Sequence, residues 1–532
     1  MKLHSPLAGV AAAAACIALL ASCSTTPDAN ITERSKTITI GVPAIPPTID
    51  QAVYPGESAR WAHIMYGEGL LEYIPLPTDA TALQDPTQLQ PALAETFDIG
   101  TDKITMTLRD AVSAAGNKLT AEDVKWTFDR AIALEDSTGL FYLRTAGLNL
   151  ENPVTIVDER TVEFVGDLTP LATAAFIADQ FAIIDSTLAK EYATADDPWA
   201  TTWLTTHSAG FGPYAVKDFT PDTQLTLQAN ANYWRDVPWY TEVVMTPASA
   251  ATALQLLQTG TVDYLLQVPL LQFGTLANSN EVSTFVSPSL AQDVLKFNQN
   301  YAPFQDAKVR QAISMAIDRS AIIQGPYQGV GLPAESVISR AIDGVDGPAD
   351  YYKHDLEAAK KLIAQSAFPA GFDLTLSITQ AEVSSVDVSS LAINLASQLE
   401  ALGITVSVQN IANSADLRAQ AKEGKLQSWI RIESPAVSDA VYLMNLIHVT
   451  GASSNFTGES DPAIDALVAE AALLAFGDER NVIMNQAIDR WNAQMYDVPL
   501  VQVQKTYAFV PSVCGYGPSS YQQVRVQTLS VC

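Results

Sequence analysis

Helix-like and strand-like stretches alternate along the C-terminal half of this sequence, and that alternation limits the fold more than any other feature. The segment DLEAAKKLIAQSA (residues 355–367) has the apolar spacing of an amphipathic helix, and FDLTLSI (372–378) follows it as a strand. The segment LAINLASQLEALGITVSVQNI (391–411) repeats the order of helix and then strand. Such repetition is typical of a layer of helices on a sheet, so we expect an α/β fold.

Shorter elements of the same kinds occupy the rest of the chain. Strands are predicted from alternating apolar residues at KTITIGVP (36–43), TMTLRDAV (105–112) and RTVEFVG (160–166). TAEDVKWTFDRAIAL (120–134) predicts a helix that begins after Thr120, because threonine is a good N-cap and acidic residues follow it. VRQAISMAIDRSAII (309–323) predicts a helix with Val309, Ile313, Ala316 and Ile317 on one face.

The length of the chain, 532 residues, is too great for one hydrophobic core and fits two or three domains. A hydrophobic fraction of 48% with 17% charged residues is that of a globular protein. We find neither a short internal repeat nor a long low-complexity linker. Short strands must therefore cross the domain boundaries, which favours lobes that the chain visits more than once.

The N-terminus reads as a targeting segment. An uncharged, Ala-rich run from about Val10 to Ala21 is short for a membrane-spanning helix, which needs about 20 apolar residues. The tetrad Leu20-Ala21-Ser22-Cys23 resembles a bacterial lipobox, in which cleavage leaves a lipid-modified cysteine as the first residue. We expect residues 1–22 to be a lipoprotein signal peptide and 23–35 to be a tether. The alternative is an ordinary secretory signal with Cys23 incidental.

Charge and cysteine content narrow the function further. A net charge of −28, from 30 Lys and Arg against 58 Asp and Glu, repels phosphate backbones, so no nucleic acid is expected as a partner. No other apolar stretch reaches membrane-spanning length. In an oxidising compartment Cys514 and Cys532 could close one disulfide loop; the alternative is two free thiols near the C-terminus.

Three segments in order resemble one known family, the extracytoplasmic solute-binding proteins of peptide, oligopeptide and nickel ABC transporters (family 5). They are PALAETFDIGTDKITMTLRDAVSAAGNKLTAEDVKWTFDRAI (91–132), GFGPYAVKDFTPDTQLTLQANANYW (210–234) and LKFNQNYAPFQDAKVRQAISMAIDR (295–319). Most of their residues look like scaffold, for example the turn at Gly210, Gly212 and Pro213. Arg310 and Asp318 could form a buried polar clamp. These segments identify the family without naming the ligand.

The resemblance implies a two-lobed fold of the periplasmic-binding-protein type. Lobe I would take residues 36–275 and 500–532, with an inserted subdomain at 71–190, and lobe II would take 276–499. Crossings near Phe297 and Pro499 would act as the hinge. The implied function is the capture of di- or oligopeptides between the lobes, outside the cytoplasm and at a membrane anchor, by a monomer that delivers them to ABC permease and ATPase subunits.

Candidate ligand-binding residues follow from the same resemblance. Oligopeptide binders of the family carry a Trp, an Asp three residues later for the peptide's α-ammonium, and an upstream Arg for its carboxylate. Trp429 matches the Trp and Arg418 lies near the Arg, whereas Ile432 stands in the Asp position and Glu433 comes one residue later. If Glu433 does not serve, the search for the ammonium partner moves to Asp439 or to main-chain carbonyls.

Two aromatic residues, Tyr54 and Trp61, could line the ligand site in lobe I or simply pack. The same scaffold could instead bind an oligosaccharide or a nickel chelate. Five histidines, none spaced as a ligand pair, argue against direct metal capture, and no cofactor is implied. A secreted hydrolase is the competing class, but hydrolase and nucleotide-binding motifs are absent, so we expect no enzyme activity. Carboxylates such as Asp293 and Asp306 carry no catalytic signal in so acidic a chain.

Overall fold

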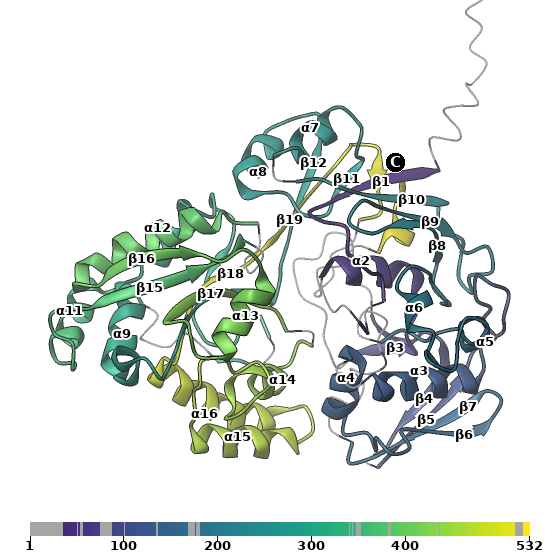
Figure 1. The fold of residues 1–532 in the computed structure, drawn as a ribbon, viewed down its shortest axis with the longest axis horizontal. Helices are drawn as coiled ribbons and strands as arrows, with labels where there is room; N and C mark the ends of the chain where they lie inside the picture. The colour runs from purple at the N-terminus through teal and green to yellow at the C-terminus, as the bar shows by residue number, and fades with distance from the viewer. Residues whose placement is uncertain are drawn as a thin grey trace, which may run out of the picture.

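The computed structural model places the chain in two lobes, each built on its own sheet (Figure 1). It describes residues 36–532 except 51, 54–56, 75–87, 101, 135–136, 169–175, 177–180, 250, 340, 343, 347–352, 381–384, 436 and 517–524. Mixed helices and sheets confirm the predicted α/β class. The signal segment, the tether, Cys23 and Tyr54 lie outside the described residues.

Lobe I has a sheet of seven strands. Their spatial order is β12 (Ser283–Ser287), β19 (Lys505–Phe509), β11 (Tyr264–Leu265), β1 (Thr37–Val42), β10 (Glu242–Pro247), β9 (Gln224–Ala229) and β8 (Tyr214–Thr220). β1 is the strand predicted at 36–43 and pairs in parallel with β10 and β11. The turn before β8 needs glycine because a Cβ on Gly210 or Gly212 would lie 2.3 or 2.6 Å from backbone atoms of Tyr66.

A smaller sheet of four strands lies within the range predicted for the inserted subdomain. It runs in the order β4 (Ala94–Ile99), β5 (Lys103–Leu108), β7 (Thr161–Val165) and β6 (Val154–Asp158), beside the helices α3 (Ala121–Ala133) and α4 (Thr138–Ala146). Thr120 and Asp123 form a capping box at the start of α3, as the sequence predicts for the N-cap. The subdomain has its own apolar core, which includes Phe128 and Phe164.

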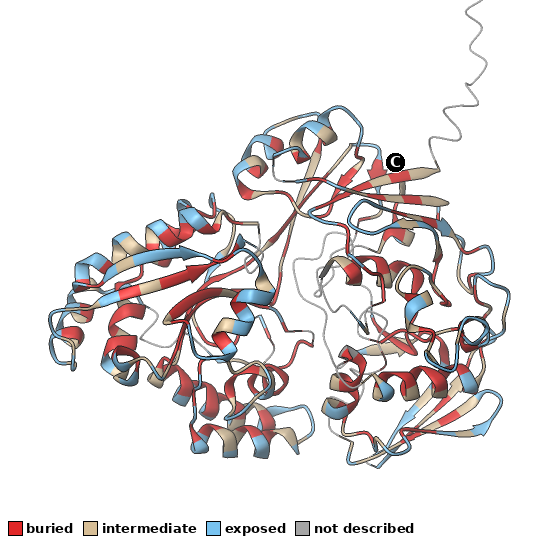
Figure 2. Ribbon diagram, in the orientation of Figure 1, coloured by how far each residue is buried: buried red, intermediate tan, exposed pale blue. Residues whose placement is uncertain are grey.

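Lobe II has a sheet of six strands. Their order is β14 (Leu332–Pro333), β18 (Val498–Gln502), β13 (Gln292–Phe297), β17 (Ser428–Glu433), β15 (Asp373–Ile378) and β16 (Thr405–Asn410). Side chains alternate between two covered faces. Ile430 faces the core under α9 (Ala307–Ala316), α11 (Leu356–Ala364) and α12 (Val388–Leu399), while Trp429 packs with Leu417 of α13 (Ser414–Lys422). Both faces of the central strands are therefore buried (Figure 2).

The remaining elements are further helices and two small strand pairs. In lobe I they are α2 (Glu57–Tyr66), β2 (Leu71–Tyr73), β3 (Leu89–Pro91), α5 (Ser186–Glu191), α6 (Thr201–Leu204), α7 (Ala253–Gln258), α8 (Leu270–Ala277), β20 (Val513–Cys514), η7 (Val526–Thr528) and β21 (Ser530–Val531). In lobe II they are η2 (Ala302–Gln305), α10 (Arg319–Gln324), η5 (Glu400–Leu402), α14 (Ala440–Leu443), η6 (Met444–His448), α15 (Pro462–Ala472) and α16 (Asp478–Gln494).

The helix predicted over 309–323 is two helices. α9 ends at Ala316, Ile317 adopts an extended conformation, and Asp318 caps α10 by accepting a hydrogen bond from the Ala321 N–H. Arg310 donates to the carbonyl oxygens of Phe304, Gln494 and Met495 instead of pairing with Asp318. The spacing of apolar residues did not reveal the break between the two helices, because Ile317 is buried in the same core as the residues of α9.

The chain crosses between the lobes at residues 288–291 and 503–504, not near Phe297 and Pro499. β12 pairs with β19 in the lobe I sheet, and β13 pairs with β18 in the lobe II sheet, so both crossings run side by side. The Val503 N–H donates to the Ala291 carbonyl across them at 2.9 Å. Of the residues that the structure describes, those within 36–287 and 505–532 therefore belong to lobe I, and those within 292–502 belong to lobe II.

The lobes also meet away from these crossings. The rings of Phe141 on α4 and Tyr442 on α14 lie 6.0 Å apart, and Val437 and Tyr442 of lobe II join the apolar core of the inserted subdomain. Figure 1 shows α4 and α14 facing each other across the molecule. Among the described residues, no helix combines the length and apolar character needed to cross a membrane.

Candidate functional site

Trp429 lies inside lobe II. Its side chain is 1% exposed and packs with Leu417 and Ala421 of α13 and with Phe456. The indole Nε1 has no hydrogen-bond partner among the described residues. Trp429 therefore packs β17 against α13, and its contact with a ligand stays a prediction.

Glu433 is engaged by a cation of the chain itself. Its Oε1 accepts a hydrogen bond from Lys296 Nζ at 2.6 Å, and both side chains are at most 2% exposed. Lys296 also donates to Asp497, which precedes β18. The sequence predicted Glu433 as the ammonium partner of a ligand; the structure gives its carboxylate to the ammonium of Lys296 instead, so we withdraw that assignment.

His448 extends this buried charge cluster, which comprises Lys296, Glu433, His448, Glu459 and Asp497. His448 Nδ1 lies 3.0 Å from Glu459 Oε1, and its Nε2 lies 3.7 Å from Glu433 Oε2. Burial alone would lower the pKa of His448, but Glu459 and Glu433 outweigh it and raise the pKa to about 9. Burial raises the pKa of Asp497 to about 7 against the opposing effect of Lys296.

Three members of the cluster have the chemistry of a metal site. Ligand-type atoms of His448, Glu459 and Asp497 lie within 4.8 Å of one another. Lys296, however, already donates to Asp497 and Glu433 and supplies a positive charge there. The cluster is therefore an internal ion-pair network. The one sign of it in the sequence is Lys296, a charged residue among the apolar residues of β13.

The two further charged candidates in lobe II also differ from the expected arrangement. Asp439 caps α14 and forms a bidentate pair with Arg480, with N–O distances of 2.5 and 3.0 Å. Its carboxylate is therefore already paired with Arg480 inside lobe II. Arg418 lies on the exposed side of α13, one residue after the buried Leu417.

In lobe I, Trp61 is 6% exposed and belongs to the apolar core with Met65 and Tyr66, so it packs. Trp61 lies on α2, and a cavity of about 60 Å³ lies between α2, α3 and residues 181–209. Its charged lining is an ion pair, Asp50 with Arg130, and burial lowers the pKa of the neighbouring His63 to about 4. A neutral imidazole and a paired carboxylate give this cavity little net charge.

Asp293 is a buried acid that the sequence did not single out. It is fully buried in β13, and its Oδ2 accepts a hydrogen bond from the Tyr327 hydroxyl at 2.5 Å. Its Oδ1 has no partner among the described residues. An acid inside a strand whose six residues are all buried is a signal that could have singled it out.

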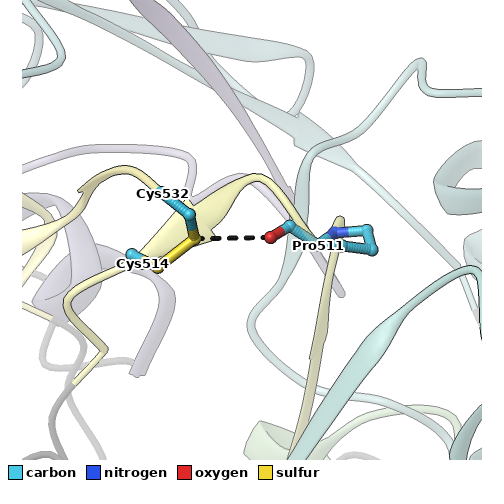
Figure 3. Close-up of a disulfide and its surroundings, with 3 residues drawn as sticks. All are labelled: Pro511, Cys514 and Cys532. Atoms are coloured by element: carbon cyan, nitrogen blue, oxygen red, sulfur yellow. Dashed lines mark hydrogen bonds between the residues drawn. A yellow bond between two sulfur atoms is a disulfide. The ribbon is translucent and has the colours of Figure 1, made fainter.

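A disulfide joins Cys514 of β20 to Cys532, the two cysteines that the sequence could pair (Figure 3). The Cys532 sulfur also lies 3.3 Å from the Pro511 carbonyl oxygen. β20 pairs with β21, so the bond fastens the C-terminal segment within lobe I.

Comparison with known proteins agrees with this architecture. Residues 88–455 match a family model described as bacterial extracellular solute-binding proteins, family 5 Middle. Heme-binding protein A of Haemophilus influenzae is 26% identical over 456 residues, which cover 82% of this chain and 83% of that protein. The dipeptide-binding protein of Escherichia coli is 30% identical over 309 residues, which cover 54% of this chain and 57% of that protein.

Solved structures share the fold at low identity. The periplasmic binding protein DppA of Helicobacter pylori, in complex with the peptide STSA, has a TM-score of 0.79 at 19% identity and covers 94% of this chain and 99% of its own. A dipeptide-binding protein of a Pseudoalteromonas species, in complex with Met-Leu, has a TM-score of 0.80 at 18% identity. The match covers 93% of this chain and 100% of that protein. The two-lobed arrangement is therefore shared along nearly the whole described chain.

Proposed function

Because this chain belongs to the family 5 bacterial extracellular solute-binding proteins, we propose that it captures short peptides between its two lobes for an ABC importer. The observation that carries the peptide class is its 30% identity to a dipeptide-binding protein. The fold suits capture because two sheets joined by two adjacent crossings can pivot as units. A ligand that touches both lobes stabilises only the closed arrangement.

Calorimetry tests the ligand class. The panel should contain mixed di- to pentapeptides, cello-oligosaccharides, nickel–histidine chelates and haem, the last because one relative is named a heme-binding protein. We expect peptides to bind with micromolar affinity, about −8 kcal/mol, and the others to bind far more weakly. Binding of sugars, chelates or haem alone would contradict the peptide proposal while leaving the family unchanged.

A lipid anchor on Cys23 would hold the receptor at the outer side of the cell membrane, where an importer needs it. Two or three acyl chains hold a protein firmly, whereas one chain holds it only marginally. We expect Cys23→Ser to move the protein from the membrane fraction to a soluble fraction. Unchanged membrane association of that variant would contradict the anchor.

A further inference from the structure

The cavity between α2, α3 and residues 181–209 belongs to lobe I alone. Every residue that the structure describes in its lining falls within residues 50–209, so no described residue of lobe II takes part. Figure 1 shows α2 and α3 together on the lobe I side of the molecule. A molecule held in this cavity would therefore not depend on closure of the two lobes.

The ring of His63 brings an unsatisfied polar group to this cavity. His63 lies on α2, and its Nδ1 atom is buried without a hydrogen-bond partner among the described residues. Burial lowers the pKa of His63 to about 4, with Asp50 opposing this effect and Arg60 adding to it, so the imidazole is neutral near pH 7. A neutral imidazole has one nitrogen that donates a hydrogen bond and one that accepts. A bound molecule that pairs with the buried nitrogen would remove the cost of leaving it unsatisfied.

The other buried polar groups of the lining are already engaged within the protein. Asp50 and Arg130 form an ion pair whose side chains are at most 7% exposed. The Tyr66 hydroxyl donates to the Ile49 carbonyl at 2.7 Å, and the Thr127 hydroxyl donates to a carbonyl of its own helix. A charged molecule would lose its hydration in this buried lining without gaining a counter-ion, so the cavity favours an uncharged one.

Size and apolar character narrow the occupant further. Several of the remaining lining residues are apolar, among them Ala131, Phe181, Ile184 and Leu204. A water molecule needs about 10–15 Å³ of cavity volume, so about 60 Å³ has room for about four to six non-hydrogen atoms. His207 is the exposed residue of the described lining, which places the entrance beside it.

We propose that this cavity binds a small uncharged organic molecule, such as a short aliphatic amide or alcohol, through a hydrogen bond to His63. The site is separate from the proposed capture of peptides between the lobes. An amide or a hydroxyl group can both donate and accept, so it suits either tautomer of the imidazole. The aliphatic part would lie against the apolar side of the cavity, where its burial is favourable.

Ligand-detected saturation-transfer NMR on the purified protein tests this site with probes of nearly equal size: propanamide, butan-1-ol, propanoate and propylammonium. We expect saturable binding of propanamide and butan-1-ol with affinities near the millimolar range, and binding of the two ions that is weaker by about tenfold or more. His63→Phe keeps an aromatic ring but removes both ring nitrogens, so it should weaken the uncharged probes by about tenfold or more. His354→Phe is the matched control, because His354 is exposed and lies outside this lining; it should leave their binding unchanged.

A second variant serves in case His63→Phe does not fold. Ala52 lines the cavity and is only partly buried, so the larger side chain in Ala52→Leu would take up part of the space and should also weaken the uncharged probes by about tenfold or more. Equal binding to wild type and to either folded variant would overturn the inference. So would equal binding of the ions, or the absence of any binding, which would leave ordered water as the only occupant.

Addition of peptide separates this site from the proposed capture between the lobes. Because no described residue of lobe II lines the cavity, saturating peptide should leave the affinity for propanamide unchanged within about twofold. Displacement of propanamide by peptide would place the probe in the peptide site and contradict a separate cavity site. A protein that binds propanamide in a His63-dependent manner but binds no peptide would contradict the peptide proposal and support this one.

Discussion

Lys296 is a lysine in the middle of a fully buried strand, and it can stay charged there because two carboxylates reach it. Glu433 and Asp497 both accept from its ammonium, and His448 joins Glu433 to Glu459. A buried ion pair adds little net stability, but removing one partner leaves an uncompensated buried charge. At the scale of residues, removal of one member of this cluster should therefore destabilise the fold.

Glu433→Ala should destabilise the protein by about 3–5 kcal/mol, because Lys296 loses a partner that it cannot replace with water. Denaturant unfolding of the purified protein measures the change. The control is Glu423→Ala, whose glutamate lies in an exposed pair with Lys425 and should contribute less than about 1 kcal/mol. Equal stability of the two variants would show that Glu433 does not hold Lys296.

His448 should make stability depend on pH in the alkaline range. Its pKa rises from 6.5 to about 9 in the folded chain, so its stabilising contribution is complete below about pH 6.5 and is lost as the pH rises through 9. We expect the thermal midpoint to fall between about pH 7 and 9.5, and to fall less in His448→Gln. A flat midpoint in wild type over that range would contradict a charged His448.

At the scale of elements, local patterns predicted individual strands and helices where their signals are strong. Alternating apolar residues predicted β1, and the N-cap residue Thr120 predicted the start of α3, because both signals lie within a few residues of sequence. The break between α9 and α10 was missed because Ile317 is apolar and buried on either interpretation. Site residues were harder to predict, since Glu433 pairs with Lys296 at a sequence distance of 137 residues.

The disulfide between Cys514 and Cys532 stabilises the C-terminal segment of lobe I. It closes a loop of 18 residues, which in the chain-entropy account contributes about 3 kcal/mol. Reduction by dithiothreitol should therefore lower the thermal midpoint, and the double variant Cys514→Ala, Cys532→Ala should show the lower midpoint with no response to reductant. An identical midpoint in the oxidised and reduced wild type would contradict this contribution.

At the scale of the whole molecule, the resemblance to the family predicted two lobes. It placed the crossings between them near Phe297 and Pro499, several residues away from where they lie. Strand pairing decides the boundary: β12 continues lobe I to Ser287, and β18 keeps lobe II to Gln502. Pairing between strands more than 200 residues apart leaves no local trace in the sequence. For the same reason, the apposition of Asp293 and Lys505 required the structure.

Phe141→Ala should loosen the closed arrangement, because it removes the ring that α4 packs against Tyr442 of α14. We expect a larger radius of gyration than wild type with peptide bound, and a weaker affinity for peptide by about threefold to tenfold, since truncating a packed aromatic ring at an interface costs about 1 kcal/mol or more. Scattering and calorimetry on the same sample measure both. Phe141→Leu, which keeps an apolar contact, should lie between wild type and Phe141→Ala.

Small-angle X-ray scattering of the purified protein, with and without a peptide that binds in calorimetry, tests the central claim most directly. If the lobes pivot about the crossings at 288–291 and 503–504 to enclose the ligand, peptide should lower the radius of gyration and narrow the distance distribution. A peptide that binds at saturation and leaves the scattering curve of a fully open protein unchanged would contradict capture between the lobes.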